Sequence, residues 1–260
     1  MALLISNVAI NMFYLPSPWI GDVVDATSTN IILTNYTVKG IYSGSGFKYK
    51  GYDVVAGTLK GYAEYSSFDS SLYYSVTGLN INAKTYANYI NSGQIYELFS
   101  TGLKGNDKLY GSEFGDYLRG FDGNDSISGG DGSDAIFGDK GKDTLTGGAG
   151  VDLFLFNSKP AKSNLDTITD FSAEDVILFD KNIFTNLPVQ SDLSSNYVIG
   201  TNNYVIGTKA LDSDDYIIFN PLNNTLYYDA DANGKGKMVA VAKIVGVTSL
   251  DVNDLIAYPL

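Results

Sequence analysis

The chain has 260 residues, a formal charge of −12, and neither cysteine nor histidine. This length allows one large domain or two small ones, and the negative charge argues against nucleic-acid binding, which needs basic patches. The lack of cysteine and histidine excludes the usual zinc ligands and a Ser-His-Asp hydrolase. No stretch reaches about 18 apolar residues, so the sequence predicts no transmembrane segment.

The N-terminal region, residues 1–101, is predicted to be a β-rich domain. Its first residues are apolar, but no basic residue precedes them, so they make a poor secretory signal peptide. Further on, apolar and polar residues alternate between glycines, which predicts an antiparallel meander of strands. The runs are IILTNYTVKGIY, GFKYKGYDVV, GTLKGYAEYSSF and SLYYSVTGLNI.

Many tyrosines occupy these predicted strands. Amphipathic aromatic residues favour half-buried sheet faces, which is the structural interpretation. The alternative is a stacking surface for a polysaccharide or a cell surface. Its candidate residues are Tyr49, Tyr52, Tyr62 and Tyr65.

Two short helices are predicted near residues 83–100. Asn82 can cap a helix that starts at Ala83 and stops near Gly93, and a second turn or two follows over Gln94–Ser100. We expect this pair to cover the start of the next segment, because a stacked repeat otherwise exposes a core and an unpaired edge.

From Gly102 to Phe156 the sequence repeats every nine residues without slipping. The units are GLKGNDKLY, GSEFGDYLR, GFDGNDSIS, GGDGSDAIF, GDKGKDTLT and GGAGVDLFL. Position 1 is always glycine, position 6 is always aspartate and position 8 is always apolar. A flexible Gly/Asp-rich linker would not keep apolar residues in register, whereas a short fixed period is typical of a stacked repeat. The unit resembles the glycine-rich nonapeptide of the RTX family.

The spacing predicts cation sites between coils. Glycines let the chain turn sharply, the turn directs carbonyl oxygens inward, and the aspartate adds a carboxylate. Two units make one coil, so turns on the same side lie 18 residues apart. Calcium fits because it accepts six to eight oxygens in a forgiving geometry. We expect about four ions, which bridge Asp107 with Asp125, Asp125 with Asp143, Asp116 with Asp134, and Asp134 with Asp152.

The candidate metal-site residues in the repeat are the six aspartates and seven glycines of the turns. They are Asp107, Asp116, Asp125, Asp134, Asp143, Asp152, Gly105, Gly120, Gly123, Gly129, Gly132, Gly138 and Gly141. The expected fold is all-β. A central right-handed parallel β-roll over 102–156 lies between the N-terminal meander with its short helical cap and a C-terminal β capping region over 157–260.

The stretch Asp166–Asp180 resembles the segment that follows the repeats in serralysin-type and other RTX proteins. Asp166, Asp170 and Asp175 match its acidic positions, which implies a further calcium at the end of the roll; a solvated acidic strand edge is the alternative. Asp214–Gly246 is predicted as three strands joined by turns. Its DADANG motif begins like an EF-hand loop, but Ala240 stands where a bidentate glutamate is needed, so a hairpin turn is expected.

The RTX resemblance implies a secreted protein, exported unfolded by a type I secretion apparatus. The chain ends in DVNDLIAYPL, which is similar to an uncleaved C-terminal secretion signal or is simply a last strand. The first functional hypothesis is an extracellular calcium-binding protein that folds on meeting calcium, with a structural, matrix or surface role. The second is an adhesin that uses the Tyr-rich sheet. The third, less favoured, is a polysaccharide-active enzyme with an RTX tail.

Overall fold

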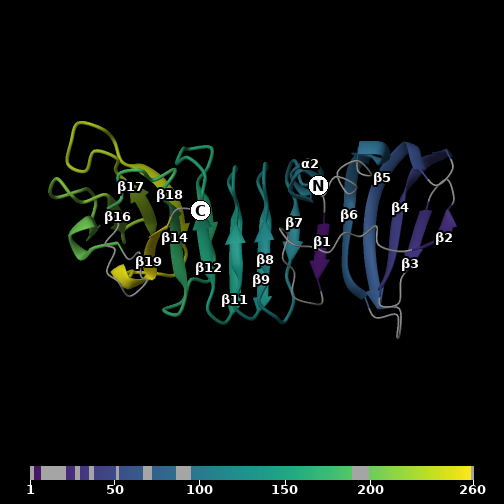
Figure 1. The fold of residues 1–260 in the computed structure, drawn as a ribbon. Coiled ribbons are helices and arrows are strands. Elements are labelled where there is room, and N and C mark those ends of the chain that lie inside the picture. The colour runs from purple at the N-terminus through teal and green to yellow at the C-terminus, as the bar shows by residue number, and fades with distance from the viewer. Residues whose placement is uncertain are drawn as a thin grey trace.

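The computed structural model describes residues 3–6, 22–26, 30–34, 38–50, 53–66, 72–85, 95–188 and 199–258. These residues form two β-sheets with few helices. Figure 1 shows an elongated molecule with a stack of short strands at its centre, the N-terminal strands at one end and the C-terminal strands at the other. The predicted all-β fold with a central parallel β-roll is confirmed.

The N-terminal strands form the predicted antiparallel meander. They are β2 (Asp22–Ala26), β3 (Asn30–Thr34), β4 (Val38–Lys50), β5 (Asp53–Ser66) and β6 (Leu72–Asn82), and each pairs with the next. The register of β4 against β5 shifts near Gly44. A Cβ there would overlap the Phe47 ring and the carbonyl oxygen of Thr58, so glycine allows the close approach at this irregularity.

Two tyrosines of the N-terminal sheet are part of its core. Tyr42 and Tyr62 are 1% and 6% exposed, and their ring centroids lie 4.6 Å apart. Tyr62 therefore cannot offer a stacking face to a ligand, because its ring is already covered. Tyr52 and the side chains of Tyr49 and Tyr65 lie outside the described residues.

The two helical segments begin where the sequence predicts them. Asn82 Oδ1 accepts the backbone N–H of Thr85 at 3.1 Å, which is the expected cap, and residues 83–85 are helical. Residues 86–94, over which the first helix was predicted to continue and the second to begin, lie outside the described residues. Helix α2 spans Ile95–Gly102 and contacts β6. It joins the N-terminal sheet to the first coil of the roll.

The roll is built from alternating short strands. They are β7 (Lys108–Tyr110), β8 (Tyr117–Arg119), β9 (Ser126–Asp131), β10 (Ala135–Phe137), β11 (Thr144–Ala149) and β12 (Leu153–Phe156). Strands β7, β9 and β11 pair in parallel in one sheet, and β8, β10 and β12 in the other. Leu109 faces Ile127 and Leu118 faces Ile136, so two nonapeptides make one coil.

The apolar residues at position 8 fill the space between the two sheets. None is more than 1% exposed: Leu109, Leu118, Ile127, Ile136, Leu145 and Phe154. Their neighbours in the strand point outward, following the period of two in a β-strand. The nine-residue period therefore places a buried apolar side chain at the same position of every half-coil.

Both sheets of the roll continue beyond Phe156, although the nine-residue period ends there. Strands β13 (Asp166–Ile168) and β18 (Val239–Ile244) extend the first sheet, and β14 (Val176–Asp180) and β19 (Leu255–Tyr258) extend the second. All these neighbours are parallel. Residues near the end of the chain thus form the last strand of the second sheet.

The remaining C-terminal strands form the predicted strand-turn-strand pattern. Strands β16 (Ile217–Asn220), β17 (Thr225–Tyr228) and β18 pair antiparallel in sequence, and β15 (Tyr204–Ile206) lies beside β16. Two 3-10 turns, Thr201–Asn203 and Val252–Asp254, precede β15 and β19. The DADANG turn between β17 and β18 is closed by a hydrogen bond from Gly236 N–H to Asp231 Oδ2 at 2.8 Å.

One strand that the sequence analysis did not predict connects the N-terminal meander to the roll. Strand β1 (Leu3–Ser6) pairs antiparallel with β6 and parallel with β7. Through β1, the meander and one face of the roll become a single continuous sheet of the described strands. The first coil of the roll is therefore not an open edge on this face.

Candidate metal centre

Two ladders of buried aspartates run along the roll, one on each side. In each ladder, the backbone N–H of one aspartate donates to Oδ1 of the aspartate in the next coil. The first ladder has N–O distances of 2.7, 2.7 and 3.0 Å and contains Asp107, Asp125, Asp143 and Asp166. The second has distances of 2.7, 3.0 and 3.0 Å and contains Asp116, Asp134, Asp152 and Asp175. The sequence-predicted pairs are therefore neighbours.

The second carboxylate oxygen of the internal aspartates has no hydrogen-bond donor. The Oδ2 atoms of Asp125, Asp134, Asp143 and Asp152 are buried and accept no hydrogen bond from the described residues. A buried carboxylate oxygen without a partner is costly, because it loses its hydration without replacement. Four such atoms at equivalent positions indicate a ligand that the protein itself does not supply.

The glycine at position 1 leaves room for this oxygen. A Cβ on Gly129 would overlap Asp134 Oδ2 and lie 2.5 Å from the carbonyl oxygen of Gly147 in the next coil. Gly120 has the same surroundings, with Asp125 Oδ2 and the carbonyl oxygen of Gly138. A carboxylate oxygen and a carbonyl oxygen from adjacent coils therefore converge on a space that any side chain would fill.

The ligand set that this geometry offers is made of oxygens alone. No group of three or more acidic, histidine or cysteine side chains gathers in the part of the chain that the structure describes. Carboxylates from two coils would thus have to be completed by backbone carbonyl oxygens. Such a mixed set suits calcium, whereas magnesium demands a stricter octahedron and usually keeps several waters. The donor atoms present therefore fit calcium.

Comparison with known protein families agrees with this geometry. A family model described as the RTX calcium-binding nonapeptide repeat (4 copies) matches residues 101–136 and 119–154. Residues 101–154 are RTX repeats. This segment is called the RTX block below. Its repeats imply calcium binding. The four buried carboxylate oxygens without hydrogen-bond donors lie in it.

Other comparisons add little. One similar solved structure is the solution structure of the AlgE6R3 subunit from the Azotobacter vinelandii mannuronan C5-epimerase. It is 24% identical, with a TM-score of 0.38, over 60% of this chain and 80% of that chain. No curated protein sequence matches.

In two of the predicted metal-site residues, Asp116 and Asp170, carboxylate oxygens already accept hydrogen bonds from the protein. Asp116 Oδ2 accepts hydrogen bonds from both the backbone N–H and the hydroxyl of Ser112, at 2.5 and 2.9 Å. Asp170 is exposed, and its two oxygens accept the N–H groups of Gly147 and Gly148, each at 2.9 Å. Asp170 therefore caps the turn at Gly147 and Gly148 and does not extend a ladder.

The glycines at position 4 of the RTX block have positive φ and let the coils stack. Gly105, Gly123, Gly132 and Gly141 have φ of +107°, +151°, +105° and +148°. A Cβ on Gly123 or Gly141 would overlap the carbonyl oxygen of the equivalent glycine in the preceding coil, whereas one on Gly105 would meet nothing within 4 Å. Gly138, at position 1, leaves space for Asp143 Oδ2.

Burial raises the pKa of the ladder carboxyls. The pKa of Asp125 rises to about 7 and that of Asp134 to about 6, mainly through desolvation, with neighbouring aspartates adding repulsion. Desolvation also raises the pKa values of Asp143 and Asp166, and the nearby charge of Asp166 raises the pKa of Asp143 further. In the absence of a cation, these carboxyls therefore release their protons at a higher pH than an ordinary aspartate.

This predicts an unusual pH dependence for the RTX block without calcium. A folded-state pKa above the unfolded value means that the folded state binds more protons. The stability that this contributes is fully present below the unfolded-state pKa and is lost as pH rises through the folded-state values of about 6 to 8. In metal-free buffer, the free energy of unfolding should be higher at pH 5 than at pH 8. Far-UV circular dichroism in chelator at the two pH values compares the folded fractions, and a folded fraction that rises from pH 5 to pH 8 would contradict the prediction.

Proposed function

We propose that this chain is a secreted calcium-binding protein whose RTX block folds when it meets extracellular calcium, with a structural, matrix or surface role. The observation that carries this proposal is the set of four buried carboxylate oxygens without donors. Each lies beside a position-1 glycine whose missing side chain leaves space for this oxygen. Bound calcium would supply the positive charge that the buried carboxylates lack.

The ladders suggest which residues hold the ions. On the first side, one site would use the carboxylates of Asp107 and Asp125, and a second site would use those of Asp125 and Asp143. On the second side, Asp134 with Asp152 is the strongest pair, because both have an orphaned Oδ2. The site between Asp116 and Asp134 is expected to be weaker, because Ser112 already occupies Asp116 Oδ2.

The ladders also suggest sites at the C-terminal end of the roll. Asp166 and Asp175 each accept the N–H of the preceding ladder aspartate, from 23 residues earlier. Asp143 with Asp166 and Asp152 with Asp175 are therefore further candidate pairs. Asp175 Oδ2 accepts the N–H of Ser172 at 2.7 Å, which makes its site the weaker of the two.

Folding and calcium binding would be coupled by the charge of the ladders. Several carboxylates at successive coil positions repel one another when ionised, and their burial is unfavourable without a cation. Extracellular calcium modules bind with a Kd of about 10⁻⁴ to 10⁻³ M. The block would therefore stay unfolded in the cytosol, and binding to the folded state alone would drive folding outside the cell.

This coupling supports export by a type I secretion apparatus, through which a chain passes unfolded. In the described residues, no helix is long and apolar enough to span a membrane. Leu255, Ile256 and Ala257 of the terminal segment lie in β19, which pairs with β14. A role as secretion signal would therefore require β19 to be unpaired before calcium binds, as the coupled-folding model expects.

A calcium titration tests the proposal directly. Far-UV circular dichroism of the full chain should show a cooperative gain of β-signal between chelated buffer and about 10 mM calcium, above the range typical of extracellular modules. Magnesium at the same concentration should produce little change, because it does not adapt to the mixed oxygen set. A chain already fully folded in chelator, or folded equally by magnesium, would contradict the proposal.

A further inference from the structure

The turns on the two sides of the roll differ at position 2 of the repeat. In the fourth and sixth units, on the side of the second ladder, this position is Gly130 and Gly148, with φ of +111° and +109°. In the third and fifth units, on the side of the first ladder, it is Phe121 and Asp139, with φ of +70° and +66°. The left-handed region is unfavourable for a residue with a Cβ, and such residues persist only where the surrounding structure holds them.

Arg119 contacts both of these left-handed residues. Its guanidinium forms a two-pronged ion pair with Asp139, in which Nη2 donates to Oδ1 at 2.7 Å and Nε donates to Oδ2. The same group lies 5.3 Å from the ring centroid of Phe121 and 5.4 Å from that of Phe137, within the range of a cation–π contact. One side chain therefore links position 2 of two adjacent coils.

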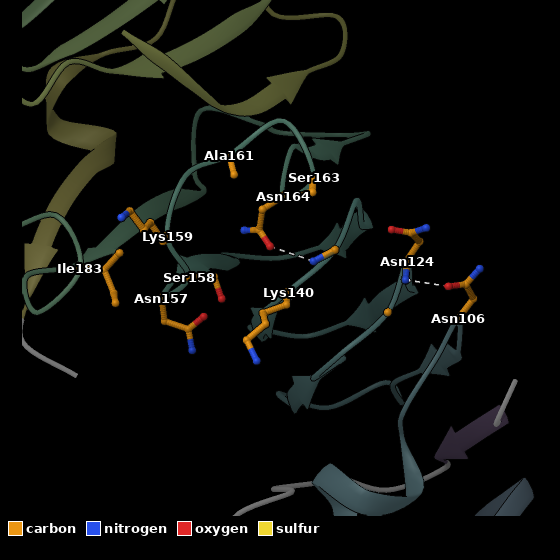
Figure 2. Close-up of a pocket in the computed structure, with 12 residues that line it drawn as sticks. Asn106, Asn124, Lys140, Asn157, Ser158, Lys159, Ala161, Ser163, Asn164 and Ile183 are labelled. Atoms are coloured by element: carbon orange, nitrogen blue, oxygen red, sulfur yellow. Dashed lines mark hydrogen bonds between the residues drawn. The ribbon is translucent and has the colours of Figure 1, made fainter. Parts of the chain in front are cut away.

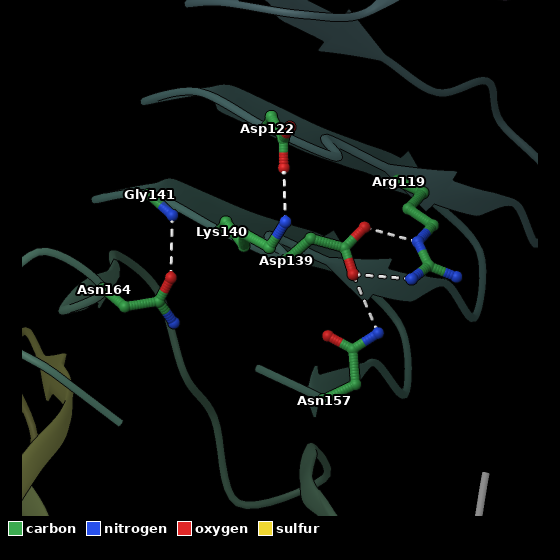
Figure 3. A network of polar contacts seen from close by, with 7 residues as sticks. All are labelled: Arg119, Asp122, Asp139, Lys140, Gly141, Asn157 and Asn164. Atoms are coloured by element: carbon green, nitrogen blue, oxygen red, sulfur yellow. Dashed lines mark hydrogen bonds and ion pairs between the residues drawn. The ribbon is translucent and has the colours of Figure 1, made fainter. Parts of the chain in front are cut away.

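This ion pair is largely enclosed. Lys140 and Asn157 line a cavity of about 560 Å³ outside the first-ladder turns (Figure 2), whereas the side chains of Arg119 and Asp139 are only 15% and 8% exposed. Figure 3 shows Asp139 between Arg119 and Asn157, whose Nδ2 donates to Asp139 Oδ1 at 2.8 Å. Because a planar guanidinium that makes two bonds to a carboxylate also fixes its orientation, the side chain of Asp139 is held in one place.

Asp139 directly follows a residue whose carbonyl oxygen borders a proposed calcium site. A Cβ on Gly120 would overlap Asp125 Oδ2 and lie 2.9 Å from the carbonyl oxygen of Gly138, so these two oxygens border the same space. That carbonyl belongs to the peptide between Gly138 and Asp139, and the φ of Asp139 sets the direction of this peptide relative to the chain that follows. A change of φ at Asp139 would therefore turn a candidate ligand away from Asp125.

We propose that Arg119 is a positioning residue for the calcium site between Asp125 and Asp143. A guanidinium has no acceptor and cannot coordinate a cation. It acts by stabilising the left-handed conformation of Asp139, and with it the direction of the Gly138 carbonyl. Removing a group that orients a metal ligand typically changes metal affinity about 10–100-fold. This inference rests on the proposed function, because it names what orients one ligand of a calcium site.

Hydrogen exchange of the ladder amides tests the proposal in the full chain, folded in about 10 mM calcium, because local exchange reports local opening. The N–H groups of Asp107 and Asp125 report on the first ladder, and those of Asp116 and Asp134 on the second. In Arg119→Gln, the first-ladder amides should exchange at least about tenfold faster, and the second-ladder amides should keep their rates. Further calcium should slow the first-ladder exchange again, because binding to the closed state suppresses opening.

Two double variants separate positioning from simple neutralisation of Asp139. Arg119→Gln with Asp139→Gly removes both charges and places at 139 a residue that adopts positive φ without strain, so first-ladder exchange should return close to the wild-type rate. Arg119→Gln with Asp139→Ala removes the same charges but keeps a Cβ, so exchange should remain fast. If Arg119 only neutralised Asp139, the two double variants would behave alike.

Lys140→Gln is the matched control. Lys140 also pairs across adjacent coils, with Asp122 at 3.0 Å, but these two side chains are 75% and 57% exposed. An exposed pair of this kind contributes little and does not include a left-handed residue. The substitution should leave the exchange rates of both ladders unchanged.

Three results would overturn the proposal. They are unchanged first-ladder exchange in Arg119→Gln, equal acceleration on both sides of the roll, and identical behaviour of the two double variants. If Arg119→Gln does not fold in calcium, the double variants carry the test, and a glycine double variant that also fails to fold overturns the proposal. A wild-type chain without calcium-dependent folding would instead refute the proposed function, so the two failures are distinguishable.

Discussion

Asp125→Asn is expected to raise the calcium concentration needed for folding by at least about tenfold, the lower end of what altered metal surroundings usually cost. Asp125 lies in the middle of its ladder. Its Oδ1 accepts the N–H of Asp107 at 2.7 Å, and its own N–H donates to Asp143 at 2.7 Å. Asparagine can keep the first bond, but an NH₂ group replaces an oxygen that faces the carbonyl of Gly138. Two proposed sites therefore lose a carboxylate ligand.

The same variant should behave in the opposite way in chelator. Asparagine carries no charge, so the desolvation that raises the pKa of Asp125 to about 7 no longer opposes folding. The variant should be at least as structured as the wild type without calcium and less responsive to it. A simple loss of packing would instead lower stability under both conditions.

Two controls belong to this experiment, which is read as the midpoint of a calcium titration. Asp107→Asn changes the end of the ladder and should shift the midpoint less, because Asp107 belongs to one proposed site. Asp122→Asn changes an exposed aspartate that pairs with Lys140 at the surface, and it should not shift the midpoint. Identical midpoints for Asp125→Asn and Asp122→Asn would refute the assignment of the ladder as ligands.

Gly141→Ala should prevent the coils from stacking, even in 10 mM calcium. The new methyl group would overlap the carbonyl oxygen of Gly123 in the preceding coil, so neighbouring strands would have to separate. Overpacking typically costs about 1–3 kcal/mol, and a side chain at positive φ adds about 1–2 kcal/mol. We expect the free energy of unfolding in calcium to fall by about the sum of these two effects.

Gly105→Ala is the matched control for this prediction. Gly105 occupies the same position of the repeat and also has positive φ, +107°, but a Cβ there meets no atom within 4 Å. Only the backbone cost of about 1–2 kcal/mol should remain. Urea denaturation in calcium compares the two variants, and equal destabilisation would show that coil stacking does not depend on Gly141.

The strands and aspartate pairs of the roll could be predicted because residues at a constant spacing in the sequence specify them. A fixed nine-residue period places Leu109 and Ile127 at equivalent positions, and their pairing follows once two units make a coil. The same reasoning paired Asp107 with Asp125. The burial of Tyr62 against Tyr42 could not be read in this way, because alternation marks the two faces of a strand without saying which neighbour covers them.

By itself, the sequence determined the repeat, its two strands per coil, the aspartate pairs and the oxygen-based ligand chemistry, because each depends on residues at a constant spacing. Tertiary structure alone decided three other features. β1 closes the sheet beside β7. Asp166 and Asp175, which the RTX resemblance had named as candidates together with Asp170, take their places in the two ladders across a 23-residue step. Arg119, Asp139 and Asn157 form one hydrogen-bonded chain. These contacts join residues that no constant spacing in the sequence relates, so only the packing of the complete chain brings them together.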